Sequence, residues 1–309
     1  MAQFVLRRFL YALLLLVVAS VLIFYGLRVA PGDIVTAIAS PTQALVIKST
    51  LTKQLGLDRP LAVQYFVFVG HVLQGNPGVS VVSGAPISTI IRESGLRTLE
   101  LGLSAAFLTY ALAIPLGVLA AWKRNSVLDQ GLRFFTVLGM GVPNFFLAVI
   151  LIQVLAVNHH WLPVAGPGGI RHLILPAVVL SVEAIALNLR LMRSSLLEEL
   201  SNDYIRTLRA KGITNRRVIC VHALRNALTP VIALAGVILP TLLGYTLIVE
   251  TVFRYEGLGF QLVQAITKRD YALAQTLALL LTAVVILCNF LADVGHHVID
   301  PRVREGSRR

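Results

Sequence analysis

The segment from Glu198 to Asn226 holds the residues that are best suited to bind another molecule. Its lysines and arginines are concentrated between Arg206 and Arg217, with one more at Arg225, and Gly212 stands alone among them. Guanidinium and ammonium groups bind carboxylates, phosphates and anionic lipid headgroups. The segment lies between two long apolar stretches, so its chemistry is that of a binding loop.

Four polar residues occur in or beside the apolar stretches themselves. Gln153, Glu183, Asn188 and Glu250 are all flanked by apolar sequence. Such side chains are costly in lipid, so they face other helices or a watery path and commonly serve function. We expect these four to be candidates for lining a translocation path, with Glu183 first and Glu250 second. In the alternative interpretation Glu183 is structural and satisfies a neighbouring helix or is protonated.

No catalytic or metal-binding set accompanies these residues. The sequence has no G-x-x-x-x-G-K-[ST] phosphate loop, no C-x-x-C and no H-E-x-x-H. The pairs His159-His160 and His296-His297 are adjacent in sequence, and adjacent residues point in different directions on a helix. We therefore expect no catalytic residue, no metal and no cofactor in this chain, and no enzymatic activity of its own.

The composition identifies the class of protein that must position these residues. Of the 309 residues, 56% are hydrophobic and only 14% are charged, and the mean hydropathy is +0.79. About 20 apolar residues cross a bilayer as a helix. Six segments qualify or nearly do: Phe9–Leu27, Leu101–Trp122, Phe134–Val157, Leu173–Leu189, Leu228–Val249 and Tyr271–Ala292. The sequence predicts an all-α, multi-pass membrane protein with six transmembrane helices.

The distribution of positive charge predicts the orientation. The loops on one side of the six spans carry 17 Lys/Arg and those on the other carry 10, six of which lie in one long loop. By the positive-inside rule, both termini should be cytoplasmic. The net charge of +12 is then explained by this topology and by anionic membrane lipid, without a nucleic-acid partner. A cleaved signal peptide is the alternative for the first segment, but its apolar run is long enough for a span.

A short amphipathic helix is predicted inside the basic segment. Leu197, Leu200, Tyr204 and Leu208 recur at steps of three or four, which gives one apolar stripe. Residues 201–203 offer N-cap side chains, and Gly212 is a typical C-terminal stop. Two interpretations remain open on composition alone: a helix lying on anionic lipid, or a helix that docks onto a cytosolic protein.

The spans divide the chain into four parts. Residues 1–30 form an N-terminal span and residues 31–97 an external region, in which 61–70 and 79–91 are too short to span and are expected to pack outside the membrane as short helices or surface segments. Residues 98–294 form a five-helix core that contains the basic loop at 198–226. Residues 295–309 form a basic cytoplasmic tail.

The basic segment resembles a known motif. Residues 203–212, DYIRTLRAKG, followed by HALRNA at 222–227, resemble the cytoplasmic coupling loop of ABC importer permeases, in detail the dipeptide/oligopeptide/nickel group. Similar matches are PGD at 31–33, GLDRP at 56–60, TLEL at 98–101, LD at 128–129, WLP at 161–163 and VETVF at 249–253. One departure is Glu256, which stands where the family commonly has a proline.

This resemblance implies a type I importer permease in the inner membrane of a prokaryote. A second, similar permease would form the solute path with it, two ATPase domains would bind ATP and Mg²⁺, and an external solute-binding protein would deliver cargo. The residues that would couple to the ATPases are Asp203, Tyr204, Arg206, Thr207, Arg209, Ala210, Lys211, Gly212, Arg225 and Asn226.

The cargo is less well defined than the family. Short peptides fit the group, while nickel, glutathione and haem are carried by its other members. A proton-coupled secondary transporter is the alternative from another class, with Glu183 as its proton relay, although no inverted repeat supports it.

Overall fold

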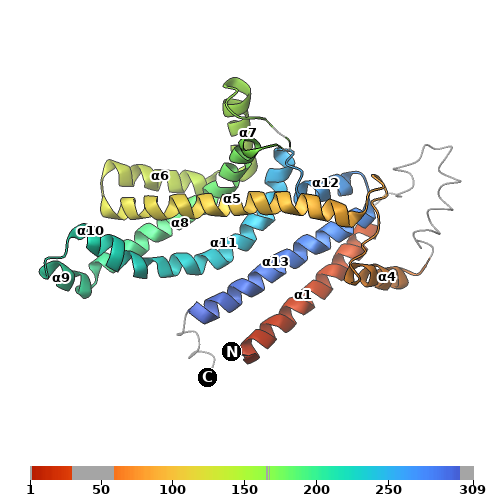
Figure 1. The fold of residues 1–309 in the computed structure, drawn as a ribbon, viewed down its shortest axis with the longest axis horizontal. Coiled ribbons are helices and arrows are strands. Elements are labelled where there is room, and N and C mark those ends of the chain that lie inside the picture. Colours follow the sequence, from red (N-terminus) through yellow and green to blue (C-terminus); the bar gives the residue numbers. More distant parts are fainter. Residues whose placement is uncertain (1, 30–58, 165, 167, 300–309) are drawn as a thin grey trace. The chain divides into compact units, whose positions relative to one another are not determined.

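The computed structural model of the protein describes residues 2–29, 59–164, 166 and 168–299. Within these ranges the regular elements are helices, apart from an isolated β-bridge between Val79 and Pro86 (Figure 1). The α-helices are α1 (Ala2–Val29), α4 (Leu61–Leu73), α5 (Ile87–Trp122), α6 (Val127–Gly141), α7 (Asn144–Leu151), α8 (Ile170–Ser201), α9 (Asp203–Ala210), α10 (Asn215–Arg217), α11 (Leu224–Val252), α12 (Leu258–Thr267) and α13 (Tyr271–Ile299). Two π-helical segments, η1 (Ile152–Asn158) and η2 (Val218–Ala223), continue α7 and precede α11. The predicted all-α class is confirmed.

Five of the predicted spans lie inside helices that are long and apolar enough to cross a membrane. These helical segments are Gln3–Arg28, Ile87–Trp122, Ile170–Ser201, Asn215–Val252 and Tyr271–Gly295. Each is longer than the predicted span because helices continue past the apolar stretch into polar sequence. The sixth span is present if the bent pair of α6 and α7–η1 counts as one.

The predicted third span, Phe134–Val157, is a bent pair of helices and not one straight helix. The chain bends by 108° between Val127–Gly141 and Asn144–Asn158. The break is at Pro143, whose ring disfavours a continuing helix and biases the residue before it toward extended backbone. Val142 accordingly has φ −92° and ψ 118°. The third span is therefore a broken one.

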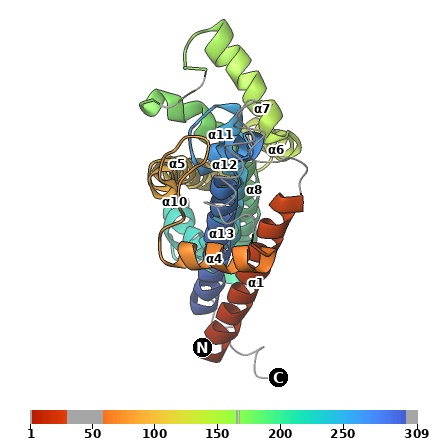
Figure 2. The same cartoon turned by 90° about the vertical axis from the view of Figure 1, so that its right-hand side faces the viewer.

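Contacts divide the chain into two compact units. The helices α5 and α13 each begin in the first unit and end in the second. The first comprises the described residues up to Leu99 and Glu256–Phe290. In it α4 lies across α1, where the Tyr65 hydroxyl is 2.7 Å from that of Ser20 and the Phe68 ring stacks on Phe24 (Figure 2). The helix expected at 61–70 is thus present as α4. For 79–91, expected as a short helix or a surface segment, residues 79–86 form a turn closed by the β-bridge, and α5 begins at Ile87.

The second unit comprises the described residues of Glu100–Tyr255 and those from Leu291 onward. Its central element is α8, in which 67% of the most apolar stretch is buried, against 28% for the corresponding stretches in α5 and α11. Small residues let neighbouring helices approach α8 closely. A Cβ atom at Gly139 of α6 would lie 3.0 Å from Ala186 Cβ. Therefore α8 is the helix that the rest of this unit packs around (Figure 1).

Candidate functional site

The basic segment between α8 and α11 is the strongest candidate site. The helix α8 ends at Ser201, and Asn202, with ψ 150°, turns the chain into α9 (Asp203–Ala210). The prediction that one helix carries the whole apolar stripe is therefore wrong. Leu197 and Leu200 belong to α8, and Tyr204 and Leu208 belong to α9. All four nevertheless pack against one apolar cluster.

The anchor of α9 in this cluster is a residue that the spacing did not single out. Ile205 is fully buried, together with Leu196 of α8 and Ile219 of η2. Because α9 is only 8 residues long, it would be marginal on its own. Burial of Ile205 contributes about 1.5–3 kcal/mol, and this contact fixes which face of α9 points outward.

The predicted stop at Gly212 is confirmed. Gly212 has φ +77°, in the left-handed region that glycine adopts without strain. Its N–H donates to Arg209 O at 2.9 Å, and the N–H of Ile213 donates to Leu208 O at 3.3 Å. These two bonds form a Schellman motif, which satisfies the last carbonyls of α9. The turn directs the chain from α9 into α10.

Most of the residues predicted to couple to another protein lie at the surface. Asp203, Arg206, Thr207, Arg209, Ala210, Lys211, Gly212, Arg225 and Asn226 are exposed, and Tyr204 is half-buried. Asp203 and Arg206 form an ion pair of 3.3 Å, but both side chains are largely exposed, so the pair adds little stability. The outer face of α9 is thus free for a partner in the part of the chain that the structure describes.

A polar network holds the inner face of α9. The Tyr204 hydroxyl donates to Glu199 Oε2 at 2.7 Å, and Asn226 Nδ2 donates to the Tyr204 oxygen at 3.3 Å. Partial burial and the bond to Glu199 raise the pKa of the Tyr204 phenol, so it stays a donor at neutral pH. Glu199 was not predicted as a site residue, because no spacing rule relates it to Asn226, which is 27 positions away. Tyr204 and Asn226 therefore position α9 between α8 and α11.

Removal of the Tyr204 hydroxyl should loosen α9. Tyr204→Phe keeps the ring but leaves the Glu199 carboxylate without its shortest bond, and a hydrogen bond to a charged group is worth roughly 1.5–3 kcal/mol. We expect amide exchange in α9 to become faster by about tenfold in the purified protein, as measured by hydrogen–deuterium exchange. Tyr25→Phe on α1 serves as the control. Unchanged exchange in Tyr204→Phe would show that the network does not hold α9.

The four candidates for a translocation path lie in different environments. Glu183 is half-buried on α8, five positions before the fully buried Asn188. Glu250 is fully buried on α11, and Gln153 is exposed on η1, where it donates to Asn158 Oδ1 at 3.0 Å. Asn188 Nδ2 donates to Ala184 O at 2.9 Å, but its Oδ1 has no hydrogen-bond partner among the described residues. Glu183 is thus the more accessible of the two candidates on α8.

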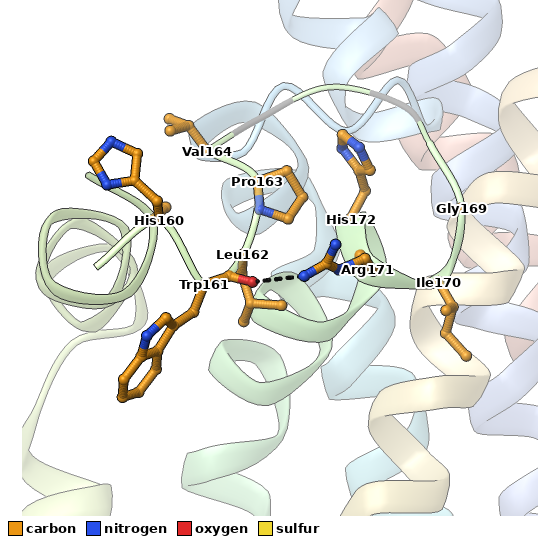
Figure 3. A pocket seen from close by; sticks show the side chains of 10 residues that line it. His160, Trp161, Leu162, Pro163, Val164, Gly169, Ile170, Arg171 and His172 are labelled. Atoms are coloured by element: carbon orange, nitrogen blue, oxygen red, sulfur yellow. Dashed lines mark hydrogen bonds between the residues drawn. The ribbon is translucent and has the colours of Figure 1, made fainter. Parts of the chain in front are cut away.

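A cavity of about 620 Å³ lies beside the N-terminal end of α8 (Figure 3). Trp161 and His160 line it on one side, and Arg171 and His172 on the other. The Arg171 guanidinium donates to Trp161 O at 3.2 Å, and His172 Nδ1 is 3.1 Å from Gly166 O. These bonds fasten the loop before α8 to the first turn of that helix.

Solved structures of similar fold are those of the MetNI methionine ABC transporter in inward-facing conformations. One of their chains matches with a TM-score of 0.57 and 24% identity, over 68% of this chain and 96% of that chain. The likeness concerns the fold.

Curated relatives match along nearly the whole length. A probable peptide ABC transporter permease protein of Sinorhizobium fredii is 37% identical over 312 residues, or 98% of this chain and 100% of the relative. An oligopeptide transport system permease protein of Bacillus subtilis is 36% identical, over 98% of this chain and 99% of the relative. A glutathione transport system permease protein of Salmonella typhi is 37% identical, with the same two shares.

Two family descriptions cover both ends of the chain. Residues 1–86 match the N-terminal part of the binding-protein-dependent transport system membrane component. Residues 113–305 match the binding-protein-dependent transport system inner membrane component. The chain therefore belongs to the family of binding-protein-dependent transport system inner membrane components, the membrane-spanning permeases of ATP-driven importers.

Proposed function

We propose that this permease takes up short peptides and that ATPase subunits in the cytosol drive it through α9. The observation that carries the proposal is the exposed face of α9, which the buried Ile205 and the turn at Gly212 hold outside the helical core. A helix with exposed Arg206, Arg209 and Lys211 suits an acidic groove on a protein partner. The chain has no phosphate loop, so its energy must come from other subunits.

The rest of the assembly follows from the family. A second, similar permease would complete the solute path, with Glu183 facing it from the central helix α8. ATP and Mg²⁺ would act on two ATPase domains, and α9 and both termini would then lie in the cytoplasm. An external solute-binding protein would meet the opposite side, where residues 31–97 and the loop around Glu256 are expected to lie. Residues 31–58 of that region lie outside the described residues.

Peptide cargo rests on the named relatives. Two of them are named for peptide or oligopeptide transport and one for glutathione, which is itself a tripeptide. The shared chemistry is a small zwitterionic or anionic molecule with peptide bonds. Selection among such cargoes would reside largely in the external binding protein.

Purification and uptake test the proposal together. The tagged chain, isolated from its native membrane in mild detergent, should bring with it a second permease and ATPase subunits. Right-side-out vesicles that are loaded with ATP and given the binding protein with labelled di- and tripeptides should accumulate label. Accumulation that persists without ATP but collapses with the proton gradient would overturn the proposal in favour of secondary transport. Failure to carry any peptide while still using ATP would remove the peptide cargo alone.

A further inference from the structure

Asp129, at the start of α6, is a buried carboxylate held by several donors. Arg193 of α8 donates to it twice, Nε to Oδ1 at 2.6 Å and Nη2 to Oδ2 at 2.8 Å. The Asn125 N–H donates to Oδ2 at 2.9 Å, and Arg133 Nε lies 3.8 Å from Oδ1. The Asp129 side chain is fully buried and that of Arg193 is 18% exposed. The two helices are thus joined by a bidentate ion pair whose carboxylate is buried.

A buried ion pair is weak evidence of a large contribution to the free energy of unfolding. Its desolvation can cost as much as its attraction gains, and apolar residues of similar volume often serve as well. Its particular property is geometric, because the planar guanidinium and the carboxylate meet in one orientation and at one distance. The contact between Asp129 and Arg193 therefore fixes how α6 and α8 are placed along and around each other.

A second contact fastens the same two helices farther along. At Gly139 of α6 an added Cβ would lie 3.0 Å from Ala186 Cβ and 3.4 Å from Val182 Cγ1 of α8. Between the two contacts, Leu132 of α6 packs against buried residues of α8. The two helices run antiparallel, because the contacting residue number rises from 129 to 139 in α6 while it falls from 193 to 186 in α8. Thus α6 cannot shift far without α8.

The end of α8 leads directly into the proposed coupling helix. Arg193 precedes the last residue of α8 by two turns, and only Asn202 separates α8 from α9. On this basis we propose that the Asp129–Arg193 pair transmits displacement of α9 from α8 to α6, and through α6 to the bend at Pro143. Both are positioning residues for transport. The inference rests on the proposed coupling to ATPase subunits and adds the route by which that motion enters the membrane region.

The test compares uptake per ATP hydrolysed in the complete complex, reconstituted in vesicles. The double variant Asp129→Asn/Arg193→Met removes both charges and nearly keeps the volume. We expect it to assemble and to hydrolyse ATP at the basal rate, while peptide uptake per ATP falls at least tenfold. Arg193→Lys keeps the charge but loses the bidentate geometry of the guanidinium, and its peptide uptake per ATP should fall about threefold. Arg190→Met, an exposed arginine one turn earlier on α8, is the matched control.

The outcomes separate the two proposals. A double variant that assembles with the wild-type ratio of uptake to ATP overturns the transmission role. A merely structural pair would lower complex yield, hydrolysis and uptake together and leave that ratio unchanged, which also overturns it. If the double variant does not accumulate in the membrane, the ratio of uptake to ATP hydrolysis in Arg193→Lys tests the transmission role, and a wild-type ratio overturns it. Absence of ATP-dependent uptake in the wild-type complex would instead overturn the proposed function.

Discussion

Gly212→Pro should abolish coupled transport while leaving the protein in the membrane. Proline fixes φ near −65°, whereas Gly212 has φ +77°, and proline lacks the N–H that bonds to Arg209 O at 2.9 Å. The Schellman turn therefore cannot form, and α9 loses the orientation that exposes its basic face. A loss of 1.4 kcal/mol in docking weakens an interaction tenfold, so we expect peptide uptake to fall by at least tenfold.

Membrane insertion should survive because Gly212 is exposed and lies outside the spanning helices. The measurement is uptake and cargo-stimulated ATP hydrolysis in reconstituted vesicles, with the amount of chain in the membrane as the reference. Gly212→Asn is the matched control, since asparagine tolerates the left-handed region better than other non-glycine residues. Its activity should stay within about twofold of the wild type. Wild-type uptake by Gly212→Pro would exclude α9 as the coupling element.

The helical class and the positions of five spans were predictable because they depend on local composition. A run of about 20 apolar residues has one stable solution in lipid, a helix, wherever its neighbours are. The bend after Gly141 was harder to foresee. Pro115 lies inside the continuous helix α5 and Pro143 at a break, although both occur in apolar sequence. The presence of a proline alone therefore does not distinguish a continuous helix from a broken one.

The basic segment shows the same limit at shorter range. Gly212 was predictable because the chemistry of a helix stop is local. The division of the apolar stripe between α8 and α9 was not, since Leu200 and Tyr204 keep helical spacing across the turn at Asn202. Asp129 belongs to a motif that resembles the family, but its partner Arg193 lies 64 positions away. Only the fold brings such charges together.

Gly117→Ala should destabilise the helical core of the second unit. A Cβ at Gly117 of α5 would lie 2.7 Å from Met192 Cβ and 3.0 Å from Leu189 O of α8. The first of these atoms is fixed to the backbone and the second is part of it, so the two helices must separate. Overpacking of this kind costs about 1–3 kcal/mol.

The measurement is the midpoint of unfolding in a titration of the purified protein from mild detergent into sodium dodecyl sulfate. Gly131→Ala on α6 is the matched control, because a Cβ there meets no atom within 4 Å. Alanine favours helix over glycine by roughly 0.8–1 kcal/mol, so the control should unfold at the wild-type midpoint or above it. Gly117→Ala gains the same helix propensity, and a lower midpoint therefore measures the clash with α8 directly. Equal midpoints in the two variants would mean that α5 and α8 are not in the close contact at Gly117 and Met192 that the structure shows.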